Sequence, residues 1–509
     1  MERSACAQWR RPRRAGGTGE PGRWGRGRGR RPRQQRRRVA PQAVTPENPD
    51  RVMWGRSMLR PYVFPCTFPR RMTDLKRSLR LADGLAMVVG MTVGAGIFRT
   101  PGLVAARLGR PGLTFVAWVL GAALAFLGAL CFAELTTRQP RAAGKYVFVR
   151  EAFGPRAGFV VGWVEALGTN GVAIAAIGVA AGEFLVRLSG RPPALIAPIG
   201  VGLVALFTGI NLVGVASGRW VQNVVTAAKL LALGGVVVIA FARGTGAGWH
   251  GALPEAPVGW GVWVAVALAA HPVIWTYYGY PDLAKIAGEV VDPSRTLPRV
   301  LLGGLAATAA LYLALNAAFL QVLPLERIAA SNLVAADVMD TLVGASGGVL
   351  VAGLALLVVL ASLNGNVFVT PRVLFGLARD GLAPAALARV NAGGTPWVAM
   401  LAIGVFAMAL AATGTFELLL GLAIVQVLLI DSWAVIGLFR LRSRDGPAPF
   451  SVPGYPWVPL VFVAVYTALL VGTVRAQPKL VAGALAMLVV AYGLSWMVNK
   501  RTVEDGRGR

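Results

Sequence analysis

The chain has 509 residues, 55% of them hydrophobic and 15% charged, and its 51 basic residues outnumber its 23 acidic residues to give a net charge of +28. This composition excludes an ordinary water-soluble protein and indicates a chain that crosses a membrane many times. With three cysteines and two histidines, a disulfide framework and a histidine–cysteine metal cluster are excluded too. There is no Walker-type phosphate loop, so we expect no bound metal, no cofactor and no ATP-driven activity.

Residues 1–71 differ from the rest of the chain. They hold nineteen arginines and four acidic residues among many prolines and glycines, and we expect this arm to be disordered. A nucleic-acid arm or a patch for anionic lipid headgroups would each use such a charge. A simpler interpretation is that Met72 is the natural start and that the upstream stretch translates noncoding sequence. We predict no nucleic-acid partner and no signal peptide.

Hydrophobic runs recur from Leu81 to Val498. A span needs about 20 apolar residues, and this rule predicts an all-α membrane domain over 72–499, followed by a tail at 500–509. The two spans on either side of Gly414 are nearly continuous, so their separation is the weakest part of the topology. The twelve predicted spans are 82–108, 112–137, 157–188, 194–212, 218–242, 258–288, 298–323, 343–378, 397–413, 415–439, 456–474 and 479–498.

Basic residues gather in alternate loops, after spans two, six, eight and ten. Cationic loops translocate poorly and stay in the cytoplasm. We therefore expect both termini to be cytoplasmic, in a protein of the cytoplasmic (plasma) membrane. These residues are Arg138, Arg141, Lys145, Arg150, Arg156, Arg295, Arg299, Arg372, Arg379, Arg389, Arg440, Arg442 and Arg444.

Span one is interrupted between Val89 and Gly102, where four glycines and Pro101 fall within fourteen residues. Glycine weakens a helix, and proline also removes a backbone donor. Non-helical backbone at membrane depth is tolerated only where it is buried in protein or lines a wet cavity. The interruption therefore predicts a substrate site.

Span six is interrupted in the same way by Tyr-Tyr-Gly-Tyr-Pro-Asp at 277–282. The two breaks lie five spans apart, as expected if 258–439 repeats 82–242 with inverted topology and 456–498 adds two helices. The N-terminal ends of the half-helices have unpaired amides that attract an anionic group, and the C-terminal ends have unpaired carbonyls that attract a cation. A zwitterion such as a free amino acid fits this arrangement.

Short motifs also follow one another in a fixed order and spacing. They are Gly94-Ala95-Gly96-Ile97-Phe98; Ala133-Glu134-Leu135 with Pro140, Gly144, Tyr146 and Ala152-Phe153-Gly154; Glu289-Val290-Val291-Asp292-Pro293-Ser294-Arg295-Thr296-Leu297-Pro298; and Ala378-Arg379-Asp380-Gly381 with Thr395-Pro396. Over residues 75–500 the chain resembles the amino acid, polyamine and organocation transporters, and more closely the bacterial relatives of the L-type amino acid transporters. The resemblance implies a LeuT-like fold, a 5+5 inverted repeat with discontinuous helices one and six.

The resemblance also implies which residues meet the substrate. The backbone of Gly94, Ala95, Gly96 and Ile97 would meet its carboxylate and amino group. On the facing break, Trp275 would form an aromatic gate, and the lining residues would be Tyr277, Tyr278 and Gly279. Relatives commonly read Phe-small-Tyr-Gly-Gly-Trp-Asn where this chain reads Trp-Thr-Tyr-Tyr-Gly-Tyr-Pro at 275–281. The side-chain pocket is therefore reshaped, and substrate identity does not carry over.

Lys229 lies near the centre of span five, where an ionisable group is costly and points to function. The resemblance places a lysine at this position facing the broken first helix. It would act as a proton carrier, or as a fixed cation where sodium-coupled relatives hold a sodium ion. The structural alternative is that it simply ties helix one to helix five.

Other ionisable groups inside the spans have functional and structural interpretations side by side. Arg99 would complement a substrate carboxylate, pair with Glu165 in span three, or reach the membrane surface as a structural residue. Glu165 would be a proton partner or part of a buried ion pair. Glu134 and Glu289 lie nearer the cytoplasmic ends, where gate salt bridges with loop arginines would explain them.

Polar residues in three later spans complete the candidates. Asp431 and His271 are lone polar groups, for which we expect structural hydrogen bonds. In span eight, the candidates Ser362, Asn364 and Asn366 would reach the site or a coupling ion, or else join helices to one another.

Together these features predict a secondary transporter that works by alternating access and takes up a small neutral amino acid with a proton, in contact with membrane lipid. An amino acid or polyamine exchanger is the alternative of the same class, although few acidic residues lie inside the spans to bind amines. A channel or membrane sensor would not need paired breaks. No nucleophile and base are paired, so we predict no enzyme.

Overall fold

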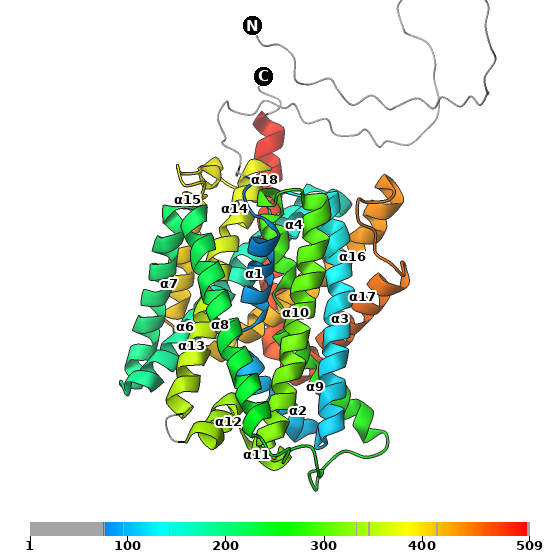
Figure 1. Ribbon diagram of the computed structural model, residues 1–509. Coiled ribbons are helices and arrows are strands. Elements are labelled where there is room, and N and C mark those ends of the chain that lie inside the picture. The colour runs from blue at the N-terminus through cyan, green and yellow to red at the C-terminus, as the bar shows by residue number, and fades with distance from the viewer. Residues whose placement is uncertain are drawn as a thin grey trace, which may run out of the picture. The chain divides into compact units, whose positions relative to one another are not determined.

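The computed structural model in Figure 1 describes Leu75 and residues 77–505, except for 95, 142, 332, 345–346 and 414–415. The arm at 1–71, the proposed start at Met72 and the last four residues of the tail lie outside this part of the chain. The described residues are helical or irregular, apart from one isolated bridge between Leu79 and Val290.

The helices follow the predicted spans closely. Their bounds are α1 Leu81–Thr92, α2 Gly96–Leu108, α3 Pro111–Arg138, α4 Tyr146–Phe153, α5 Pro155–Trp163, the π-helix η1 Val164–Gly171, α6 Val172–Ser189, the 3-10 turn η2 Pro193–Leu195, α7 Ile196–Val213, α8 Val215–Arg243, α9 Gly261–Thr276, the 3-10 helix η3 Tyr280–Glu289, α10 Pro293–Val322, α11 Leu325–Ala330, α12 Val334–Val343, α13 Gly347–Val369, α14 Pro371–Arg379, the 3-10 turn η4 Ala385–Ala388, α15 Trp397–Ala411, α16 Phe416–Asp445, α17 Trp457–Ala476 and α18 Pro478–Asp505.

By length and composition, ten described helical segments can cross a membrane, and the bent pair of α1 and α2 makes an eleventh. The remaining predicted span, 397–413, corresponds to α15, whose 15 residues fall short of the roughly 20 that a straight span needs. It is nevertheless a helix separate from α16, so the predicted division near Gly414 is present. The all-helical membrane fold is confirmed.

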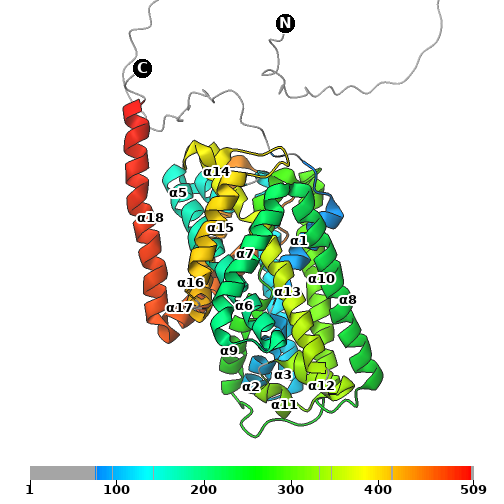
Figure 2. The ribbon, with the colours of Figure 1, turned by 90° about the vertical axis from the view of Figure 1, so that its left-hand side faces the viewer.

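The helices with breaks lie at the centre of this arrangement. Helix α1 packs among α8, α10 and α13, while α2 packs against α9 and α1 also contacts η3. Each half of the first broken helix therefore meets the opposite half of the second. Helices α17 and α18 pack on α16, and Figure 2 shows α18 along one side.

The membrane unit has two distinct ends in Figure 1. One carries α4 and α14 near the start of α1, and we call it the α4/α14 end. The opposite one carries α11 and α12 beside the far end of α2, and we call it the α11/α12 end. These names distinguish the two ends without assigning either to a side of the membrane.

Both predicted breaks are present. The axes of α1 and α2 differ by 47° where the chain is interrupted after Thr92. Helix α9 ends at Thr276, and the chain resumes as a 3-10 helix after Gly279, whose φ is 136°. A Cβ atom at Gly279 would lie 2.8 Å from Thr92 N. Both the backbone angle and the close approach of α1 therefore require glycine here.

We predict that Gly279→Ala lowers the free energy of unfolding by about 1–3 kcal/mol, because alanine cannot adopt this conformation without strain. The melting temperature of the purified protein is the measurement. Gly234→Ala on α8 is the control, since nothing lies within 4 Å of its added Cβ. Equal melting temperatures for the two variants would contradict the close approach of the two breaks.

Candidate functional site

A central cavity of about 690 Å³ lies where the two breaks meet. Gly94 and Gly96 line it from the first break, and Trp275 and Tyr278 from the second. The cavity continues toward the α11/α12 end, where its wall includes the exposed Arg99. Helix α6 adds three alanines and Glu183 to the wall, and α13 and α16 add Ser362 and apolar residues.

Not every predicted contact residue faces this space. Ala95 lies outside the described residues. Ile97 is fully buried behind the wall, and the Tyr277 ring packs against Trp118 and Tyr312 at centroid distances of 5.9 and 5.1 Å. Gly279 instead supports the approach of η3 to α1. The cavity is therefore lined by a subset of the motif residues, and the others shape the breaks.

The ends of the broken helices give the cavity its polarity. The first turn of α2 contributes amides that have no partner within the helix, together with a positive dipole end. Nearby, the Tyr312 hydroxyl lies 2.9 Å from Thr92 O and 3.1 Å from Thr276 O, at the carboxyl ends of α1 and α9. A bond of 2.8 Å between the hydroxyls of Thr100 and Thr276 joins α2 to α9. An anion-attracting end and two cation-attracting ends thus lie side by side.

Lys229 lies against the last turn of α1, as the resemblance implied. Its Nζ donates to Gly90 O and Val93 O at 2.7 Å each, and its side chain is completely buried. Ser362 Oγ lies 3.4 and 3.5 Å from the same two oxygens. The ammonium group therefore caps carbonyls that the break leaves without helical partners.

Of the other two candidates on α13, Asn364 joins helices to one another, and Asn366 bonds within its own helix. Asn364 Nδ2 donates to Gln222 Oε1 at 2.9 Å, and its Oδ1 accepts from Asn211 Nδ2 at 2.9 Å. Asn366 Nδ2 donates to Ser362 O at 2.9 Å. Of the three, Ser362 alone is part of the cavity wall among the described residues.

The suggested pairing of Arg99 with Glu165 is wrong. Arg99 is exposed on α2, whereas Glu165 is buried in η1 toward the α4/α14 end. There Glu165 Oε2 accepts from the backbone amide of Lys145 at 3.0 Å. Its Oε1 is buried and has no hydrogen-bond partner among the described residues. The two side chains therefore lie apart, with Arg99 on the cavity wall and Glu165 outside the lining.

A buried ion cluster lies on the side of the cavity toward the α4/α14 end, and the sequence did not predict it. It is formed by Lys145, Asp282, Lys285 and Asp431. Lys145 Nζ lies 2.5 Å from Asp431 Oδ1, and Lys285 Nζ lies 2.5 Å from Asp282 Oδ1. Asp431 is thus an ion-pair partner and not the lone polar group we expected. Asp431 has this partner because Lys145, which we expected in a loop, turns inward just before the buried α4.

Tyr278 connects this cluster to the cavity. Its ring stacks on Trp275 at 5.7 Å with an interplanar angle of 5°. Its hydroxyl accepts from Lys145 Nζ at 2.5 Å and donates to Asp431 Oδ2 at 3.0 Å. One signal for the cluster was in the sequence, since Asp282 and Lys285 are three residues apart in an otherwise apolar segment. The side chain of His271 is not among those described.

Further ion pairs close the α4/α14 end. Glu134 pairs with Arg138 at 2.6 Å, and Glu289 pairs with Arg372 at 2.8 Å. Outside the spans, Tyr146 OH donates to Asp380 Oδ2 at 2.9 Å. Burial and the neighbouring Asp380 carboxylate raise the pKa of Tyr146 well above its usual value, so this hydroxyl stays a donor.

Comparison with known proteins adds to this geometry. A family model described as "Amino acid permease" matches residues 79–495. A serine/threonine exchanger of Bacillus subtilis, SteT, is 29% identical over 82% of this chain and 97% of its own length. The b(0,+)-type amino acid transporter 1 of Rattus norvegicus is 26% identical over 80% and 84% of the two chains. The Asc-type amino acid transporter 1 of Mus musculus is 27% identical over 79% and 78%.

We predict that Asp431→Asn lowers the free energy of unfolding by about 3–5 kcal/mol, because it leaves the Lys145 ammonium buried without its carboxylate. Thermal unfolding in detergent measures this. Asp445→Asn, on the same helix but in an exposed pair with Arg444, should cost about 1 kcal/mol or less.

The double variant Lys145→Met/Asp431→Leu removes both charges together and should recover part of the loss. If Asp431→Asn destabilises the protein no more than Asp445→Asn, the buried pair does not hold this end together.

Proposed function

The chain belongs to the amino acid permease family and is an integral membrane transporter of amino acids, not an enzyme; from that premise we propose that it takes up a small neutral amino acid together with a proton, by alternating access. The observation that carries the proposal is the position of Lys229, a fully buried lysine on the carbonyl end of α1, where it shares its two oxygens with the cavity residue Ser362.

The polarity of the cavity supports a zwitterionic substrate. A carboxylate placed at the first turn of α2 meets free amides, and an ammonium group placed at the ends of α1 and α9 meets carbonyl oxygens. Among the described residues of the wall, Glu183 is the one carboxylate. A polyamine has several positive charges and no negative one, so this lining favours an amino acid over a polyamine.

The charge distribution supports an orientation. The α4/α14 end carries the arginines that pair with Glu134 and Glu289, and the loops there hold further basic residues. By the positive-inside rule we propose that this end lies on the cytoplasmic side of the plasma membrane, together with both termini. The central cavity then opens to the outside, and the ion pairs and the buried ion cluster close the inside. This corresponds to the outward-facing state of an alternating-access cycle.

Lys229 links a proton to the movement of α1. Protonated, its Nζ binds the carbonyls of Gly90 and Val93 as a cation, which holds α1 to α8. After proton loss the amine is a weaker donor, because hydrogen bonds from a charged group are about twice as strong as neutral ones. Release of the proton would therefore loosen α1, and this is the step we assign to inward opening.

Obligatory exchange of amino acids is the second candidate, favoured by the name of the Bacillus subtilis relative, a serine/threonine exchanger. In that case Lys229 stays charged throughout the cycle and stands as a fixed cation. Exchange and proton-coupled uptake require the same cavity and differ in what drives the return step.

The full chain, reconstituted into liposomes, should take up labelled alanine, serine or threonine at least 10-fold faster with an inward proton gradient than without one. Lys229→Ala should abolish this acceleration, because α1 loses its titratable tie. Lys479→Ala is the control, since Lys479 is an exposed lysine on α18.

Other results would change the proposal in different ways. Uptake that needs amino acid inside the liposomes and ignores the gradient would replace proton coupling with exchange. Gradient-driven uptake that survives Lys229→Ala would remove Lys229 as the proton carrier. Uptake of larger amino acids but not of these three would contradict the small substrate.

A further inference from the structure

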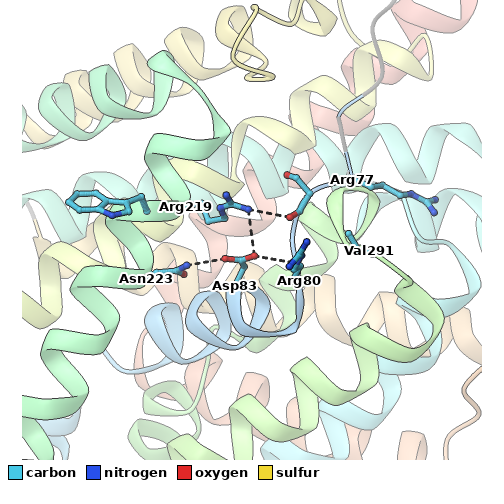
Figure 3. Close-up of a pocket in the computed structure, with 8 residues that line it drawn as sticks. Arg77, Arg80, Asp83, Arg219, Asn223 and Val291 are labelled. Carbon is cyan, nitrogen blue, oxygen red and sulfur yellow. Dashed lines mark hydrogen bonds and ion pairs between the residues drawn. The ribbon is translucent and has the colours of Figure 1, made fainter.

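A second hollow lies at the α4/α14 end, outside the central cavity, with a volume of about 550 Å³. Figure 3 shows it between the chain before α1, the first turns of α8 and Val291. We call it the arginine pocket, after Arg77, Arg80 and Arg219, which line it with one carboxylate, Asp83. The described charges of the pocket therefore sum to +2.

The hydrogen bonds in the pocket leave its positive charge incompletely balanced. Asp83 Oδ2 lies 3.7 Å from Arg219 Nη1 and accepts from the backbone amide of Arg80 at 3.0 Å. Asp83 Oδ1 accepts from Asn223 Nδ2 at 2.9 Å, and Arg219 Nη1 donates to Ser78 O at 3.2 Å. Figure 3 shows Arg219, Asn223 and Arg80 around Asp83. One carboxylate with a long ion pair cannot neutralise three guanidinium groups.

The outer face of α8 fixes the level of the pocket in the membrane. Trp220, Val224, Leu231 and Val238 expose 66%, 46%, 78% and 68% of their surface, so this face meets lipid tails. Its arginines, Arg219 and Arg243, lie about 36 Å apart at 1.5 Å per residue, slightly more than the roughly 30 Å of hydrocarbon. Trp220, next to Arg219, is a residue type typical of the membrane interface. The arginine pocket is therefore at headgroup level and open to lipid.

We propose that the arginine pocket binds the phosphate of an anionic lipid headgroup from the leaflet at the α4/α14 end. Guanidinium groups match phosphate oxygens in bidentate geometry, and basic pockets beside membrane helices bind such headgroups. Arg80 and Arg219 are the principal ligands, Arg77 adds charge at the rim, and the start of α1 contributes its positive dipole end. The lipid tails lie along the apolar face of α8.

This site acts on a helix that the central cavity also uses. Arg80 and Asp83 belong to the start of α1, and Arg219 and Asn223 belong to α8, so a bound phosphate bridges the two helices. Lys229 of the same α8 holds the other end of α1. A lipid in the arginine pocket thus strengthens the attachment of α1 to α8 and stabilises the arrangement seen in this structure.

Native mass spectrometry and thermal unfolding of the full chain in a neutral detergent test the proposal. Dioleoyl phosphatidylglycerol should bind at least 10-fold more tightly than dioleoyl phosphatidylcholine and raise the melting temperature by several degrees. Arg80→Gln/Arg219→Gln should lose at least 10-fold in phosphatidylglycerol binding. Arg243→Gln, on the same helix at its other end, should bind it like the unaltered protein.

A second variant guards against a folding defect in the arginine double variant. Asp83→Asn keeps all three arginines and removes the competing carboxylate, so it should bind phosphatidylglycerol as tightly as the unaltered protein or more tightly.

Three outcomes would overturn the proposal. If inorganic phosphate reproduces the stabilisation and displaces the lipid, the pocket takes a free anion. If phosphatidylcholine binds equally, the contact is with lipid in general. If Arg243→Gln loses as much binding as the double variant, the effect is one of overall charge. Neither readout requires transport, so the result is independent of the proposed function.

Discussion

Backbone groups inside a bilayer have no water to bond with, and the two broken helices create such groups at the centre of this protein. The structure meets the constraint with side chains from neighbouring helices. Tyr312 of α10 serves the carbonyl ends of both α1 and α9, while Lys229 and Ser362 serve the last turn of α1. The breaks persist because three other helices supply these partners. The amides at the start of α2 are the groups left to a ligand.

The α4/α14 end is held together by buried ion pairs, which carry a large desolvation cost. Buried ions lose their hydration, and their attraction compensates only when geometry and extra hydrogen bonds are good. Lys145 and Asp431 meet this condition with the Tyr278 hydroxyl as a third member. A buried set of this kind is stable when all its members are in contact. Removing one member strongly destabilises the folded protein, because it leaves a buried charge without a partner. That property suits a closure that must be either shut or fully released.

Local signals made the fold and the breaks predictable. Glycine and proline within apolar runs mark the interruptions at 89–102 and 277–282, and hydropathy alone places nearly every span. Pairing across long stretches of chain could not be predicted in this way. Lys145 and Asp431 are 286 residues apart, and no local pattern distinguishes a lysine that turns inward from one in a cytoplasmic loop. The alternative that paired Arg99 with Glu165 is wrong, because the depth of a side chain in the membrane cannot be read from either residue alone.

Tyr278 has its ring on the cavity wall and its hydroxyl in the buried ion cluster. In this chain, a change of this side chain would alter ligand fit and the buried ion cluster at once, so one residue links the two properties. Ala173, Ala176 and Ala180 on α6 face the same cavity without a polar partner to lose. A larger side chain at any of these three alanines would therefore change ligand fit and leave the buried ion cluster intact.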